Sequence, residues 1–160
     1  MRTDHRGFSL IELLIVVAII LIIAAIAIPN LLRSRIAANQ ASAISSCRVI
    51  NTAEVTYASS YGAGFSSTLE QLGPPASGPV GPSAAGLLDS GLANRVKSGY
   101  SFTYAPGIPD SRGFCNGYTV NGGPTQVGVT GTAYYFTDQA YVIRANSTGP
   151  ASASDSPVAN

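Results

Sequence analysis

The stretch that decides the fold is Gly7–Asn30, which reads GFSLIELLIVVAIILIIAAIAIPN. Its apolar part, Phe8–Ile28, contains twenty-one residues, of which only Ser9 and Glu12 are polar. About twenty consecutive apolar residues are enough for a helix to cross the hydrocarbon core of a bilayer. The sequence therefore predicts a transmembrane helix over residues 8–28, with a carboxylate close to its beginning.

The rest of the 160-residue chain has a different composition, rich in Gly, Ser, Ala, Thr and Asn. Charged residues make up 11% of the chain, and the formal net charge is +1. Proteins that bind nucleic acid neutralise phosphates with a basic surface, so we expect that this chain requires no DNA or RNA. The length suits one globular domain attached to an apolar anchor.

Two ordinary interpretations of the apolar segment leave Glu12 unexplained. The segment resembles a secretory signal, because Arg2 and Arg6 precede it and Ala25-Ile26-Ala27 fits a cleavage site for signal peptidase. Cleavage after Ala27 would release a monomeric secreted binding protein. The second interpretation is a simple membrane anchor. An acidic residue in a lipid-facing helix costs up to ~3 kcal/mol and usually marks a function, which neither interpretation supplies.

A third interpretation rests on the order Gly7-Phe8-Ser9-Leu10-Ile11-Glu12, followed by a long aliphatic run and Pro29. Over Met1–Asn51 this pattern resembles the N-terminus of type IV prepilins and of the pseudopilins of type II secretion. The resemblance implies that residues 1–7 are a leader, that a prepilin peptidase cuts between Gly7 and Phe8, and that the same enzyme methylates the new amine of Phe8.

The resemblance also implies a role for Glu12. Cleavage creates an ammonium group at Phe8, and packing the helices of many subunits brings such amines next to the carboxylates of neighbours. Either charge alone in an apolar bundle would be costly, so a pair between Glu12 and the Phe8 amine of another subunit would set the register of assembly. Many pilins have a glycine where this chain has Leu21, so we expect less local opening of the helix between Leu21 and Pro29.

The function implied by the resemblance is that of a structural subunit which polymerises with itself into a type IV pilus. A pseudopilin of a type II secretion system is the alternative. The implied location is the bacterial inner membrane, crossed once, and then an extracellular or periplasmic filament. The implied partners are other copies of the chain, the prepilin peptidase and an assembly platform in the membrane.

After Pro29 the pattern becomes amphipathic, and we predict that residues 29–60 continue the helix. One face carries apolar residues at intervals near three and four, which are Leu32, Ile36, Ala43, Cys47, Ile50 and Tyr57. The opposite face is expected at Arg33, Arg35, Asn39, Ser42, Ser45, Arg48 and Thr52. Gly62 is a plausible end of the helix.

Residues 61–147 are predicted to form an α+β head, in which an antiparallel sheet packs on the second half of the helix. A short helical turn is expected from Ser67 to Leu72, then a loop over 73–86, and another short helix within 87–96. The predicted strands contain residues 100–104, 118–120, 133–137 and 141–144, with a tight turn at Asp138-Gln139. Residues 148–160 are expected to be a flexible tail or a surface strand.

Chemistry beyond assembly is not indicated. The single histidine, His5, lies in the leader, and the acids Glu54, Glu70, Asp89, Asp110, Asp138 and Asp155 are widely spaced. We therefore expect no enzyme, no cofactor and no metal site, and we treat Asp110 and Asp138 as loop residues. Cys47 lies on the apolar helix face and Cys115 precedes a strand, so a disulfide between them would join helix to sheet, and two buried thiols are the alternative.

Overall fold

The computed structural model describes residues 8–158. The chain divides into two units, residues 1–35 and 36–160, which are described separately below. Helix α1, Leu10–Tyr61, contributes to both. It ends where the sequence predicts, because Gly62 has a φ of 63°, a left-handed conformation that glycine adopts without steric cost.

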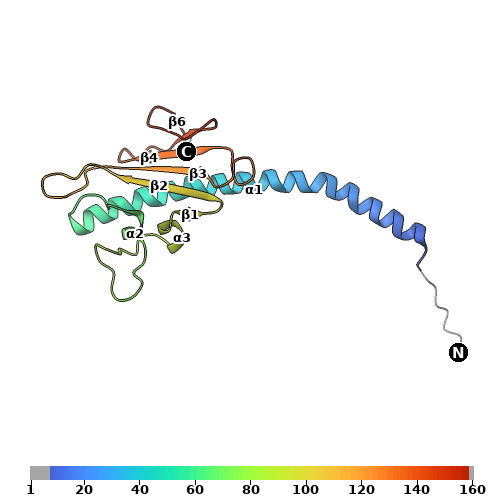
Figure 1. Ribbon diagram of the computed structural model, residues 1–160, viewed down its shortest axis with the longest axis horizontal. Helices are drawn as coiled ribbons and strands as arrows, with labels where there is room; N and C mark the ends of the chain where they lie inside the picture. Colours follow the sequence, from blue (N-terminus) through green and yellow to red (C-terminus); the bar gives the residue numbers. More distant parts are fainter. Residues whose placement is uncertain (1–7, 159–160) are drawn as a thin grey trace. The chain divides into compact units, whose positions relative to one another are not determined.

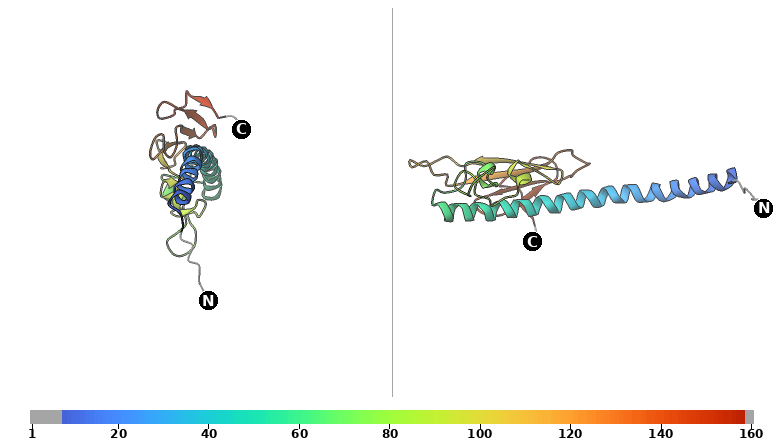
Figure 2. Two further views of the ribbon diagram at one scale, coloured as in Figure 1. Left: turned by 90° about the vertical axis from the view of Figure 1, so that its right-hand side faces the viewer. Right: turned by 90° about the horizontal axis from the view of Figure 1, so that it is seen from below.

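The second unit contains two short helices and a six-stranded antiparallel sheet. The helices are α2, Leu69–Leu72, and α3, Ser90–Ala93. The strands follow the chain in the order of the sheet: β1 Val96–Lys97, β2 Tyr100–Pro106, β3 Tyr118–Pro124, β4 Tyr134–Asp138, β5 Arg144–Asn146 and β6 Ser156–Pro157. Figures 1 and 2 show the sheet lying along the part of α1 that belongs to this unit. The predicted α+β class and the packing of sheet on helix are confirmed.

The core lies between α1 and one face of the sheet. Alternate residues of β2 point inward, and Tyr100 and Phe102 are at most 1% exposed. The sheet contributes Tyr100, Phe102, Tyr104, Tyr118, Val120 and Tyr135 to this core, and α1 contributes Ala43, Cys47, Ile50, Ala53 and Tyr57. Burying an aromatic or aliphatic side chain is worth roughly 1.5–3 kcal/mol, so this layer holds the head together.

Several local predictions require correction. The helical turn expected from Ser67 begins later, at Leu69, and Thr68 caps it, because the Thr68 hydroxyl accepts from the Gln71 N–H. The predicted strand at 141–144 is shorter and later, since Tyr141 has a φ of 63° and belongs to a turn. That turn is centred on Gln139-Ala140, because the Tyr141 N–H donates to the Asp138 carbonyl.

The part of the predicted tail that the structure describes, residues 148–158, contains an ordered strand. β6 pairs with β5 through Arg144 opposite Pro157 and Ala145 opposite Ser156. Asp155 supports this pairing, because its carboxylate accepts from Ser152 and from the Asn146 side chain. Of the two expectations for this segment, a flexible tail or a surface strand, the surface strand is the one that applies to Ser156–Pro157.

Candidate functional site

Between residues 8 and 32, the exposed side chains on all sides of α1 are mainly apolar. The exposed large apolar side chains between residues 8 and 32 are Phe8, Leu10, Ile11, Leu13, Leu14, Ile15, Val16, Val17, Ile19, Ile20, Leu21, Ile22, Ile23, Ile26, Ile28, Leu31 and Leu32. By length and composition α1 contains a segment able to cross a membrane, and none of that segment is buried within the chain. So much apolar surface requires lipid or other protein to cover it.

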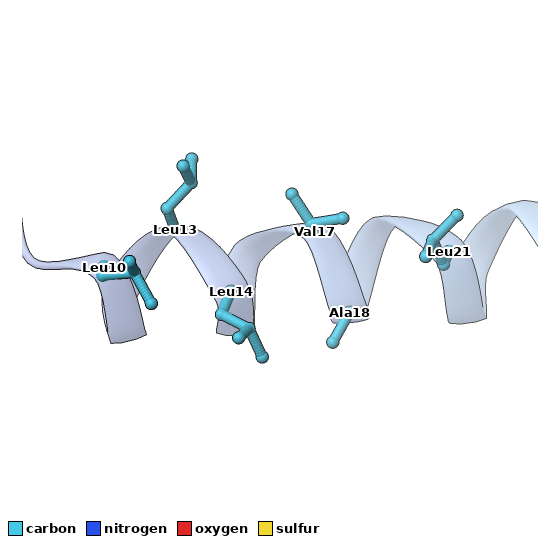
Figure 3. A pocket seen from close by; sticks show the side chains of 6 residues that line it. All are labelled: Leu10, Leu13, Leu14, Val17, Ala18 and Leu21. Atoms are coloured by element: carbon cyan, nitrogen blue, oxygen red, sulfur yellow. The ribbon is translucent and has the colours of Figure 1, made fainter.

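A shallow groove runs along this surface (Figure 3). Leu13 and Val17 stand on one side of the helix in this view, and Leu14 and Ala18 stand on the other. Residues three and four apart form the ridges and grooves by which helices interlock. The segment therefore carries the surface relief that a second helix needs for close packing.

Glu12 forms the cap of its own helix. The Ser9 backbone N–H donates to Glu12 Oε2 at 3.0 Å, and Ser9 immediately precedes α1. A carboxylate three residues after the N-cap residue that binds its free N–H is one half of a capping box. The Ser9-x-x-Glu12 spacing carries this signal in the sequence, in addition to the charge of Glu12.

Pro29 lies inside α1 without ending it. Because proline has no N–H, the carbonyl of Ala25 has no hydrogen-bond donor in the helix at that position. The helical ladder is thus missing one bond at the end of the apolar segment. Gly7, the other residue of the predicted cleavage site, and the rest of the leader lie outside the described residues.

Neutral polar contacts attach the sheet to α1 at the beginning of the second unit. The Asn39 side-chain amide donates to the Thr130 carbonyl at 2.9 Å, and Gln40 donates to the Thr132 hydroxyl at 2.8 Å. The Ser42 hydroxyl donates to that of Ser98 at 2.9 Å. Asn39 and Ser42, which were predicted on the exposed helix face, therefore contact the head.

A second neutral cluster lies deeper. Asn51 of α1 donates from its amide nitrogen to the Thr137 hydroxyl at 2.9 Å. The oxygen of the same amide accepts from the Tyr118 hydroxyl at 2.9 Å. Buried polar groups that satisfy one another in this way fix one arrangement of the packed layers. Asn51 thus ties the helix to β3 and β4 at a single register.

Glu54, the next acid along α1, is fully buried. Its carboxyl group contacts Ser66 and Tyr104, which lie in the segment after α1 and in β2. Burial raises the pKa of Glu54, and the hydrogen bonds from Ser66 and Tyr104 oppose this effect. This cluster could not be predicted from the sequence, because fifty residues separate Glu54 from Tyr104.

The predicted disulfide is absent, and both cysteines are free, buried thiols. The Cys115 carbonyl accepts from the Phe65 N–H at 2.8 Å, and the next residue, Ser66, binds Glu54. Glu54 lies about two helical turns, or ~10 Å, beyond Cys47 along α1. Cys115 is therefore attached to the segment that contacts Glu54, which lies farther along α1 than Cys47.

The loop acids serve as local backbone acceptors. Asp110 accepts from the backbone N–H groups of Arg112 and Phe114, and Asp138 accepts from that of Ala140. These bonds from Phe114 and Arg112 hold the pKa of Asp110 below its ordinary value. Among residues 8–158, no three acid, histidine or cysteine side chains are grouped so as to hold a metal ion.

A long helix that begins with an exposed apolar segment, and whose later part packs on an antiparallel sheet, has the architecture of the pilin fold. The comparisons with known proteins concern the N-terminal segment. Residues 2–28 match the family model described as the prokaryotic N-terminal methylation motif. No solved structure matches the chain significantly.

Two curated relatives are similar over the same region. The type IV major pilin protein PilA of Myxococcus xanthus is 47% identical over 53 residues, which are 33% of this chain and 24% of that protein. The type IV wide pilus major component PilA4 of Thermus thermophilus is 68% identical over 36 residues, which are 22% of this chain and 28% of that protein.

The chain therefore spans about a quarter of the length of the curated relatives that it matches. Its N-terminal segment carries the methylation motif and is similar to the matching segments of these two type IV pilus proteins.

Proposed function

We propose that the chain is the precursor of a filament subunit, cleaved between Gly7 and Phe8, methylated at Phe8 and polymerised through the apolar segment of α1 into a type IV pilus. The observation that carries the proposal is the fully exposed apolar surface of residues 8–32, which begins inside the methylation motif. Before assembly, this segment would hold the subunit in the inner membrane. In the filament, neighbouring copies would cover it.

Glu12 has two tasks in this proposal. Its Oε2 caps its own helix through Ser9, while the other carboxylate oxygen makes no hydrogen bond to the described residues. The second oxygen suits the Phe8 ammonium of a neighbouring subunit. At about 4 Å and an effective dielectric constant near 20, the attraction is ~4 kcal/mol before desolvation is subtracted.

Variants at position 12 separate these two tasks. Glu12→Gln keeps an oxygen that accepts from Ser9 but removes the charge, and Glu12→Leu removes both. We expect cleavage to be largely intact in both variants, with Phe8 as the first residue by N-terminal sequencing. Filament yield by electron microscopy should fall strongly in both, whereas the control Glu70→Gln should assemble normally, because Glu70 lies on the exposed surface of the head. Normal filaments from Glu12→Gln would refute the charge pair.

N-terminal sequencing of the wild-type protein also tests the first step. Methylated Phe8 supports the proposal, whereas Ile28 would indicate signal peptidase and a released monomer. In cells that lack the protein, loss of surface fibres with intact secretion of enzymes supports a pilus. The opposite pattern would assign the chain to the pseudopilus of a type II secretion system.

A further inference from the structure

The carboxyl group of Glu54 lies in the core of the head with neutral neighbours. Glu54 is 0% exposed, and it takes part in none of the ion pairs that the described residues form through Glu70, Asp89 and Asp110. An ionised carboxylate buried without a cation is costly, and such groups commonly take up a proton instead. The distances around Glu54 allow its protonation state to be worked out by counting hydrogens.

Three oxygen–oxygen contacts of 2.7 Å connect the cluster. Glu54 Oε1 lies 2.7 Å from Ser66 Oγ and 2.7 Å from Tyr104 Oη. Tyr104 Oη also lies 2.7 Å from the Ser66 carbonyl oxygen. This is the usual separation of an O–H···O hydrogen bond, so each contact needs one proton between its two oxygens.

The two hydroxyl groups supply only two protons. The Ser66 hydroxyl donates its one proton to Glu54. The Tyr104 hydroxyl also has one proton, which it can donate either to Glu54 or to the Ser66 carbonyl. If Glu54 were ionised, one of these short contacts would bring two lone pairs together. A proton on Glu54 Oε1 removes the conflict, because Glu54 then donates to Tyr104, Tyr104 to the Ser66 carbonyl, and Ser66 Oγ to Glu54.

We propose that Glu54 is held in the folded head as a neutral carboxylic acid. Its proton completes a ring of hydrogen bonds that joins α1 to Ser66 and to Tyr104 of β2. The packing of the sheet on the helix therefore depends on pH. The ring therefore includes groups from α1 and from β2, which lie on the two sides of the core. The Ser66 backbone N–H, which donates to Glu54 Oε2 at 2.9 Å, completes the contacts of the acid.

The titratable groups that a charge on Glu54 would influence are Tyr57 of α1, Tyr104 of β2 and Tyr118 of β3, and Cys115 of the loop before β3 lies close to Tyr57 and Tyr104. Burial raises the pKa of Tyr104 and of Tyr118, and a charge on Glu54 would raise them further. These tyrosines are therefore neutral at physiological pH. Burial is also the largest influence on the pKa of Glu54, and it acts in the same upward direction.

The direction of the pH effect follows from this raised pKa. The unfolded chain releases the Glu54 proton near pH 4.3, whereas the folded head keeps it to higher pH. The contribution of Glu54 to stability is therefore complete below about pH 4.3 and is lost as the pH rises through the folded-state pKa. Between these two values the unfolding equilibrium constant should increase about tenfold per pH unit on account of this group.

The first test observes the proton directly in the wild-type full chain in detergent. The sequence has three glutamates, Glu12, Glu54 and Glu70, so labelling glutamate with ¹³C at the carboxyl carbon gives three signals. Spectra of Glu12→Gln and Glu70→Gln assign them. We expect the Glu54 signal to stay at the position of a protonated acid well above about pH 4.3, and a titration at or below that pH would overturn the proposal.

The second test uses Glu54→Gln, whose side-chain amide can donate to Tyr104 and to Ser66 Oγ, while Ser66 Oγ donates to the Thr68 carbonyl 3.1 Å away. We expect this variant to fold. At a pH above the folded-state pKa of Glu54, its unfolding equilibrium constant should be smaller than that of the wild type. The expected factor is about ten for each pH unit by which the pKa of Glu54 in the folded protein exceeds that in the unfolded chain. Glu70→Gln is the control. The proposal would be overturned if the variant were less stable than the wild type at neutral pH and if the wild type gained stability as the pH rises. Together these results would show that Glu54 is ionised in the folded head.

Discussion

The substitution Gly131→Ala tests the packing of the loop that carries Thr130 and Thr132. Gly131 is buried against Tyr100, which is 0% exposed and donates from its hydroxyl to the Ala133 carbonyl at 2.9 Å. A Cβ atom at position 131 would lie 2.6 Å from Cζ of the Tyr100 ring. Ordinary contact begins near 3.4 Å, so the ring or the loop has to move by about 1 Å.

The expected cost has two parts. Forcing extra volume into a packed core usually costs about 1–3 kcal/mol. Moving the ring also breaks or weakens the hydrogen bond between Tyr100 and Ala133, which is worth about 1 kcal/mol. The sum, about 2–4 kcal/mol, is a large part of the roughly 5–15 kcal/mol that stabilises a typical domain.

The assay is urea unfolding of the full chain in detergent, followed by the near-UV circular dichroism of its eight tyrosines. Gly149→Ala is the matched control, because a Cβ there meets nothing within 4 Å, and it should change the unfolding free energy by less than about 0.5 kcal/mol. Adding Tyr100→Phe to Gly131→Ala removes the clashing hydroxyl and should cost less than the sum of the single changes. If Gly131→Ala unfolds within about 0.5 kcal/mol of the wild type, the close packing described here is wrong.

Two further predictions concern Asp155, near β6, and Cys47, in the core of the head. Hydrogen bonds from Ser152 hold the pKa of Asp155 below its ordinary value, so its support for β6 is present above about pH 3.9 and is lost as the pH falls through the lowered value. The protection of the Val158 amide against exchange, measured relative to its intrinsic rate at each pH, should therefore fall in acid before the protection of the β3 amides does. An equal fall at both places would contradict this. Burial raises the pKa of Cys47 to about 12, so iodoacetamide at about pH 8 should label Cys47 only as fast as the head unfolds. Mass spectrometry without reductant should find two free thiols. Rapid labelling of Cys47 in the folded protein, or a mass lower by two hydrogens, would contradict the structure.

The sequence predicts those elements that local pattern determines. The alternation of Tyr100, Phe102 and Tyr104 identified β2 and its buried face, and Gly62 marked the end of α1. The strand predicted at 141–144 failed because the Asp138 side chain accepts from the Ala140 N–H and extends the turn. β1 and β6 have two residues each, which is too short for any alternation to be recognised.

The same distinction, between features that local sequence pattern predicts and features that depend on the fold, applies to the candidate site. The motif around Phe8 and Glu12 is contiguous, so it was visible in the sequence. The cluster around Glu54 depends on Ser66 and Tyr104, which reach the helix only through the fold of the sheet. The apolar helix face likewise shows that Cys47 points inward but not whether Cys115 reaches it, and in the structure both thiols are free.

The contacts by which Asn39, Gln40 and Ser42 attach the head to α1 join uncharged groups on both sides. Dissolved ions screen attractions between charges, and they have little to act on at these contacts. These three contacts should therefore be insensitive to the salt concentration. In the extracellular filament that we propose, these contacts would hold over a wide range of salinity.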